Sequence, residues 1–163
     1  LAGIGLPEGA TPQDAEVTLA ATFARFPGVI GVMDRRADGF ADDLAVTEQI
    51  VGILGAEGYG LLLWDSGLNS ALGVAERAGQ PAALVSRQLD EAGASASAVG
   101  RQLDRAAFEA ARSGATVVMA QARPDTLAAL AAFAADGDGA RAAIGPASAV
   151  LRRMGDGAAS SSR

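Results

Sequence analysis

Short runs of consecutive apolar residues alternate with helical patterns along this chain, and this alternation constrains the fold more than any other feature. Runs such as 29–33, 60–64 and 116–120 lack the polar and apolar alternation of a half-exposed strand. A strand that is apolar throughout is buried on both faces, which is typical of a parallel sheet. Because helical segments separate the runs, the sequence predicts an α/β fold, either a barrel segment or a doubly wound sheet.

Local signals place the individual elements. Thr11, Pro12 and Asp14 supply a helix N-cap, a proline for the first turn and an early acidic residue, and Gly58 is a helix stop. We expect strands at 1–6, 29–33, 60–64, 82–85, 116–120 and 142–144, and helices at 11–25, 42–57, 69–78, 97–112, 125–135 and 146–154. The length of 163 residues suits one domain, which we place at 1–154, followed by a disordered tail at 155–163.

Composition excludes several classes of function. The net charge of −6 argues against a general nucleic-acid binder, which normally carries a basic patch. The absence of cysteine excludes disulfides, thiolate metal sites and cysteine nucleophiles. No apolar run approaches the roughly 18 residues that a membrane-spanning helix needs. The sequence has no initiator methionine and no signal peptide, so we expect it to be a trimmed or processed piece.

Polar residues collect where the predicted strands end, which is where α/β proteins bind ligands. Strand-end loops are polar in any such protein, so this distribution is compatible with a site without requiring one. We take eight of these residues as candidates for lining a cleft or binding a ligand: Asp34, Arg35, Asp65, Ser66, Arg87, Asp90, Gln121 and Arg123.

Four segments then carry a resemblance to a known family. The segments are FPGVIGVMDRRADGF, LLLWDSGLNSALGVAERAGQP, SRQLDE and SGATVVMAQARPDTLAALAAF. In order and spacing they resemble the divergent polysaccharide deacetylases, over about residues 1–152. The resemblance implies the fold of the polysaccharide deacetylase superfamily, a distorted β/α barrel, of which this chain would be the C-terminal part.

The resemblance also implies which residues hold the positions of the family's motifs. Where the family has Gly-Val-Asn-Asn-His-Met-Gly-Ser, this chain has residues 31–38, so Arg35 holds the histidine position. Its Phe-Leu-Asp-Ser is similar to residues 63–66, and its Arg followed by Phe-Leu-Asp to residues 87–90. Its Gly-His-Pro falls on residues 120–122, so Gln121 holds the second histidine position.

These replacements fall where the family's chemistry is implied to lie. The resemblance implies a metal held by an aspartate of the first strand and by the two histidines, and we expect that aspartate to lie outside this chain. Arg35 offers only donors and cannot ligate a cation, and Gln121 is a weak neutral ligand that cannot transfer a proton near neutral pH. Deacetylation needs a Lewis acid and a general acid or base. We therefore predict a pseudoenzyme with no catalytic residue, no metal ligand and no cofactor.

Two functional hypotheses from different classes are open. The first is a binding or regulatory module of the bacterial cell envelope, located in the periplasm or another extracytoplasmic space. Its partner in this hypothesis is a cell-wall glycan, a peptidoglycan hydrolase or an activator of that enzyme, and the resemblance implies the extracytoplasmic setting and the connection to cell-wall polysaccharide. The second is an active carbohydrate deacetylase with Asp34, Asp65 and Asp90 as ligands, together with a contribution from the N-terminal part that we expect to lie outside this chain. An all-carboxylate set suits Mg²⁺ or Mn²⁺ better than Zn²⁺. Convergence of these carboxylates on one point would favour the second.

The acidic residues have simpler interpretations as well. Asp65 is either a site carboxylate or a residue that holds its loop through backbone N–H groups, and we favour the loop. Asp34, Asp38, Asp42 and Asp43 form a group of oxygen ligands but lack the spacing of a calcium loop. We therefore expect Asp42 or Asp43 to cap a helix.

The arginines and the tryptophan are open in the same way. Arg35, Arg36, Arg87 and Arg123 either line a pocket for an anionic glycan or protein group, or are solvated and ion-paired. Trp64 either stacks on a sugar ring or belongs to the core.

Overall fold

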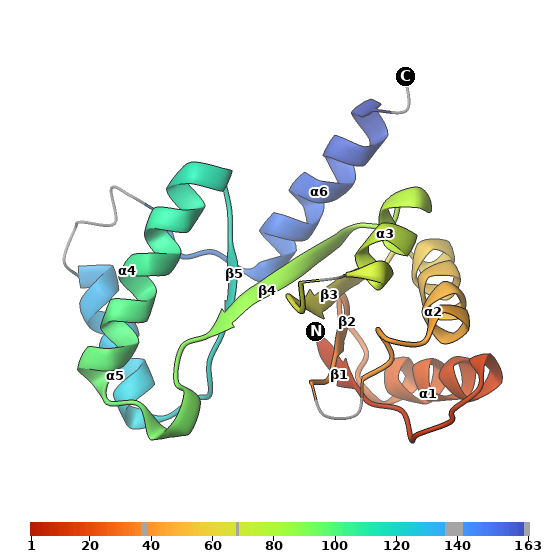
Figure 1. Ribbon diagram of the computed structural model, residues 1–163, viewed down its shortest axis with the longest axis horizontal. Coiled ribbons are helices and arrows are strands. Elements are labelled where there is room, and N and C mark those ends of the chain that lie inside the picture. Colours follow the sequence, from red (N-terminus) through yellow and green to blue (C-terminus); the bar gives the residue numbers. More distant parts are fainter. Residues whose placement is uncertain (37–38, 68, 136–141, 162–163) are drawn as a thin grey trace. The chain divides into compact units, whose positions relative to one another are not determined.

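The computed structural model describes residues 1–36, 39–67, 69–135 and 142–161 (Figure 1). Its contacts group the chain into two compact units, unit 1 with residues 1–84 and 151–163, and unit 2 with residues 85–150. One five-stranded sheet runs in the order β1-β2-β3-β4-β5, and the strand β4 contains the boundary between the units. The predicted α/β class, a parallel sheet with alternating helices, is confirmed.

Unit 1 contains the first three strands with their helices. Its elements are β1 (Ala2–Ile4), α1 (Pro12–Arg25), β2 (Gly31–Asp34), α2 (Leu44–Glu57), β3 (Gly60–Trp64), α3 (Ser70–Arg77), the start of β4 (Ala82–Gln88) and most of α6 (Ala147–Ser161). The pairs β1–β2 and β2–β3 are parallel, with Val32 opposite both Ala2 and Leu61. The Leu61 N–H donates to the carbonyl of Pro81 just before β4.

The helix ends of unit 1 follow the local signals in the sequence. Thr11 and Asp14 form a capping box at the start of α1, in which the Asp14 carboxylate accepts the Thr11 N–H at 2.8 Å. Asp43 caps α2 by accepting the Val46 N–H at 3.0 Å. Gly58 ends α2 with a φ of 73°, a conformation that glycine adopts without steric cost.

The core of unit 1 is aliphatic and closely packed around β2 and β3. Leu19 of α1, Ile50 of α2 and Leu61 of β3 are fully buried in one cluster. Gly31 and Gly60 lie opposite each other on β2 and β3, and a Cβ on Gly31 would collide with the carbonyl oxygen of Gly60. Glycine is therefore required here by the close approach of two backbones.

Unit 2 is built on the remainder of β4 and on β5. Its elements are residues 85–88 of β4, a 3₁₀ turn (Glu91–Gly93), α4 (Ala96–Ser113), β5 (Val117–Met119), α5 (Pro124–Ala135) and the first turn of α6. The β4–β5 pair is parallel, with a bulge between Val85 and Arg87. Helices α4 and α5 pack against each other (Figure 1), and Leu89, Val99, Leu103 and Ala129 form the core.

Apart from shifts in element bounds, of which the extension of β4 from the expected end at 85 to Gln88 is an example, two sequence expectations differ from the structure. The strand expected at 142–144 is wrong, because residues 142–146 form no strand. Two of the three residues are alanines, which are depleted in strands, and Ile144 is 59% exposed. Residues 155–161, expected to open a disordered tail, belong to α6. Within the described part of the chain, no helix combines the length and the apolar character needed to cross a membrane.

Candidate functional site

A wide polar cleft in unit 1 lies at the carboxyl ends of β1 and β2. We call it the β1–β2 cleft; residues 5–10 and parts of 34–46 line it, and its volume is about 880 Å³. Side chains of both charges contribute to the lining: Glu8, Asp34, Arg35, Arg36, Asp42 and Asp43. Ligands of parallel α/β sheets bind at this end of the strands, and the volume is within the range of small-molecule sites.

Asp34 ends β2 at the base of this cleft and holds the segment that leads to α2. Its side chain is buried, and Oδ1 accepts the Phe40 N–H at 2.7 Å. The Phe40 carbonyl in turn accepts the hydroxyl of Thr47, a buried residue of α2, at 3.1 Å. A Cβ on Gly39 would collide with the Asp34 carboxylate, so the aspartate and the glycine fit each other closely. Asp34 therefore stabilises the conformation of this loop.

Arg36 connects the cleft to the end of β3. Its guanidinium lies over the ring of Trp64, with Cζ 4.6 Å from the ring centroid, in cation–π geometry. Trp64 is half-buried, so it is neither a fully buried core residue nor an open platform for a sugar. Arg35 is exposed at the cleft, and its N–H donates to the Ile4 carbonyl at 3.2 Å.

The loop after β3 is organised by Asp65. Its Oδ1 accepts the Gly67 N–H at 3.2 Å and the Asn69 side-chain amide at 3.4 Å. The Ser66 hydroxyl donates to the amide oxygen of Asn69 at 3.3 Å. Asp65 thus makes the loop-holding contacts that we favoured from the sequence.

In unit 2, Asp90 joins the end of β4 to the loop after β5 and to the start of α5. The residue is 3% exposed, and its Oδ2 accepts the Gln121 N–H at 2.8 Å and the Thr126 hydroxyl at 2.9 Å. Burial raises the pKa of this carboxyl, but the hydrogen bonds from Gln121, Thr126 and Gln88 outweigh that effect and hold the pKa below its ordinary value of 3.8. The sequence places Thr126 only at a helix start similar to that of the family motif, and its contact with Asp90 could not be predicted from local spacing.

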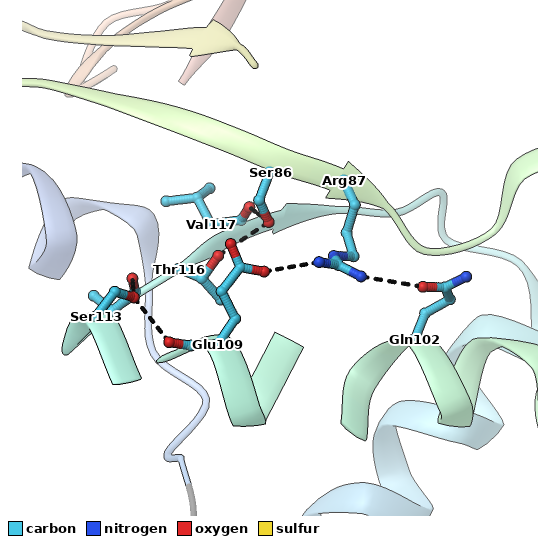
Figure 2. Close-up of polar contacts among 8 residues, drawn as sticks. Ser86, Arg87, Gln102, Glu109, Ser113, Thr116 and Val117 are labelled. Atoms are coloured by element: carbon cyan, nitrogen blue, oxygen red, sulfur yellow. Dashed lines mark hydrogen bonds and ion pairs between the residues drawn. The ribbon is translucent and has the colours of Figure 1, made fainter. Parts of the chain in front are cut away.

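Arg87 belongs to a second polar group of unit 2 (Figure 2). Its guanidinium pairs with Glu109 of α4 at 2.8 Å and donates to the Gln102 amide oxygen at 3.4 Å. Both charged side chains are about one third exposed, at 30% and 37%, so solvent screens the pair and its contribution is about 0–1 kcal/mol. Of the two interpretations of Arg87, the structure shows the ion-paired one.

The structure brings some predicted site residues together within each unit. Asp34 and Arg35 share the β1–β2 cleft, and Asp90 contacts Gln121, whose carbonyl accepts the Arg123 N–H at 2.8 Å. Asp65 and Ser66 lie in the β3 loop. Of the acidic group considered for calcium, Asp43 is a helix cap as expected, and Asp38 lies outside the described residues.

The family-implied metal does not fit the donors found at the matching positions. Arg35 and Gln121 supply a permanent cation and a neutral amide. Asp90 directs Oδ2 to a backbone N–H and a hydroxyl. Over the described ranges, no group of three or more His, Cys, Asp or Glu side chains is arranged to hold an ion.

Comparison with known proteins supplies the family context. The model of the family described as divergent polysaccharide deacetylase matches residues 4–151. None of the curated proteins matches the sequence. The fold is similar to the crystal structure of an uncharacterized protein from Agrobacterium tumefaciens C58, with a TM-score of 0.72 and 22% identity. That match covers 81% of this chain and 54% of the other, so this chain spans about half of that protein's length. At this identity the likeness shows the fold alone.

Proposed function

Because the chain belongs to the divergent polysaccharide deacetylase family, we propose that it is a non-catalytic member, which binds a cell-wall glycan in the bacterial envelope. In this role it is a binding or regulatory domain in peptidoglycan metabolism. The setting is extracytoplasmic, in the periplasm or its equivalent.

The observation that carries the proposal is the identity of two strand-end residues, Arg35 and Gln121. Each holds a position at which the family resemblance implies a metal-binding histidine. A guanidinium has no lone pair for a cation and does not release its proton near neutral pH, and a primary amide does not titrate there. Neither residue can therefore activate water or protonate a leaving group.

The carboxylates near these positions support the same proposal. Asp34 holds the Phe40 N–H, and Asp90 holds the Gln121 N–H and the Thr126 hydroxyl. A general base must present an oxygen to water or substrate. In both aspartates a carboxylate oxygen instead stabilises the loop that follows the strand.

The β1–β2 cleft supports a glycan as the ligand. Its lining combines carboxylates with the two arginines, and such groups hydrogen bond to sugar hydroxyls and to amide or carboxyl substituents. Its volume of about 880 Å³ is large enough for a short oligosaccharide segment. Arg36 lies over Trp64 in cation–π geometry, which favours one orientation of its guanidinium at the cleft.

The test measures binding and activity on the same intact protein. We expect it to sediment with purified peptidoglycan and to release no acetate from N-acetylated chitooligosaccharides, with or without added Zn²⁺, Mg²⁺ or Mn²⁺. Acetate release that a chelator abolishes would show that the carboxylates replace the histidines, and the proposal of a non-catalytic domain would be wrong.

Matched arginine variants locate the binding site. Arg36→Ala removes a cation from the cleft, and Arg77→Ala removes one from the exposed surface of α3. We expect Arg36→Ala to weaken peptidoglycan binding about tenfold, equivalent to about 1.4 kcal/mol, and Arg77→Ala to leave it unchanged. Equal effects of the two variants would indicate nonspecific attraction to an anionic polymer and would contradict a glycan site in this cleft.

A further inference from the structure

Unit 2 contains a second hollow, with a chemistry opposite to that of the β1–β2 cleft. Its walls come from α4, β5, α5 and residues 142–150, and its volume is about 170 Å³. We call it the unit 2 hollow. Leu103 of α4, Val118 of β5 and Phe133 of α5 provide its larger side chains.

The hollow follows from the size of the residues around it. Of the fifteen described residues that line it, six are alanines, and three of these are on α4: Ala106, Ala107 and Ala110. Helix α5 packs on α4. The alanines of α4 and of residues 142–147 nevertheless leave space that leucine or isoleucine would fill in a close-packed interior.

The side chains that line the hollow are almost all apolar. Among the described residues that line the hollow none has an ionisable side chain, and the one polar side chain is that of Thr116. The Thr116 hydroxyl donates to Ser86 Oγ at 3.0 Å, and Ser86 donates to the Val117 carbonyl at 3.2 Å (Figure 2). Both hydroxyl protons are thus engaged within the protein. An apolar group gains free energy when it leaves water for a lining of this kind.

We propose that the unit 2 hollow binds a hydrocarbon group of about six to eight carbon atoms, such as one aromatic ring or a short acyl chain. The size follows from the volume, because an engineered apolar cavity of about 150 Å³ binds benzene. Ile144 is 59% exposed beside the hollow, so apolar surface continues at its edge. This inference is independent of the proposed glycan site, which lies in unit 1.

The first experiment titrates toluene, 1-hexanol and benzoate into the isotopically labelled intact protein and follows amide shifts by NMR. We expect saturable shifts for toluene or 1-hexanol, confined to residues around the hollow, and NOEs from the bound probe to the methyl groups of Leu103. Benzoate should bind at least tenfold more weakly, because its charge finds no partner. No saturable binding of either neutral probe, or equal binding of benzoate, would overturn the proposal.

A pair of neighbouring variants then locates the site. Ala110→Leu places a larger side chain into the hollow, and Ala111→Leu places the same side chain on the exposed face of α4. We expect Ala110→Leu to weaken toluene binding at least tenfold and Ala111→Leu to leave it unchanged. Unchanged binding in folded Ala110→Leu would show that the probe binds elsewhere. If that variant does not fold, the NOEs to Leu103 in the unmodified protein decide the question.

Discussion

Replacement of Asp90 by alanine tests whether this carboxylate holds unit 2 together. Its Oδ2 makes two short hydrogen bonds, to the Gln121 N–H at 2.8 Å and to the Thr126 hydroxyl at 2.9 Å. Hydrogen bonds to charged groups contribute about 1.5–3 kcal/mol each, so the two together represent about 3–6 kcal/mol. Asp90→Ala also removes the cost of burying the carboxylate, which offsets part of this loss.

We therefore expect Asp90→Ala to lower the free energy of unfolding by about 3 kcal/mol, a large part of a typical domain's stability. The Thr126 side chain, 1% exposed, would be left buried without this acceptor. Asp90→Asn keeps a carbonyl oxygen at the site but removes the charge, so its loss should be about half as large.

Urea denaturation followed by far-UV circular dichroism measures these differences. The matched control is Asp65→Ala, which removes an exposed carboxylate that also accepts two hydrogen bonds. We expect the control to lose about 0.5 kcal/mol or less, as is usual for exposed positions. A loss below about 1 kcal/mol for Asp90→Ala, or one equal to that of the control, would refute the structural role of the carboxylate.

Three further predictions concern pH, backbone packing and helix capping. The pKa of Asp90 is lower in the folded state than in the unfolded state. The stability that its charge contributes to the fold is therefore complete above the unfolded-state pKa and is lost as the pH falls through the folded-state pKa. In urea titrations, the difference in free energy of unfolding between the unmodified protein and Asp90→Asn should be constant above about pH 5 and shrink below about pH 4. A difference that stays constant down to about pH 2 would contradict this linkage. Gly31→Ala should lower the free energy of unfolding by about 3 kcal/mol or more, because its Cβ would collide with the Gly60 backbone. Its control is Gly52→Ala on α2, which has open space around the added Cβ and should be neutral or stabilising in the same assay. Similar values for the two variants would be evidence against the close approach. Thr11→Ala should lower the melting temperature through a loss of about 1 kcal/mol at the α1 capping box, and no change would mean that the box does not stabilise the helix.

The sequence predicts the parts of the fold that depend on local signals. The start of α1 at Thr11 and the end of α2 at Gly58 follow from capping chemistry that involves only neighbouring residues. The strand expected at 142–144 is wrong because its local signal is weak: only three apolar residues carry it, and two of them are alanines.

The site is less predictable, because its contacts join distant residues. Asp90 and Gln121 were identified as strand-end residues, but their contact spans 31 residues, and the contact of Asp90 with Thr126 spans 36. No periodicity or local spacing encodes such a pair. In the same way, residue types alone did not show that Arg36 lies over Trp64 or that Arg87 pairs with Glu109.

The position of Trp64 determines which half of the chain can be observed by its intrinsic ultraviolet signals. The chain has one tryptophan and one tyrosine, and both Trp64 and Tyr59 belong to unit 1. Trp64 lies beneath Arg36 of the β1–β2 cleft, and Tyr59 stacks on Phe23 with ring centroids 4.1 Å apart. Tryptophan emission should therefore respond to ligands in the cleft and to unfolding of unit 1. Unfolding of unit 2 alone should leave the emission unchanged. Far-UV circular dichroism detects the helices of both units. If the circular dichroism signal begins to fall at a lower denaturant concentration than the tryptophan emission changes, unit 2 unfolds separately from unit 1 and is the less stable of the two.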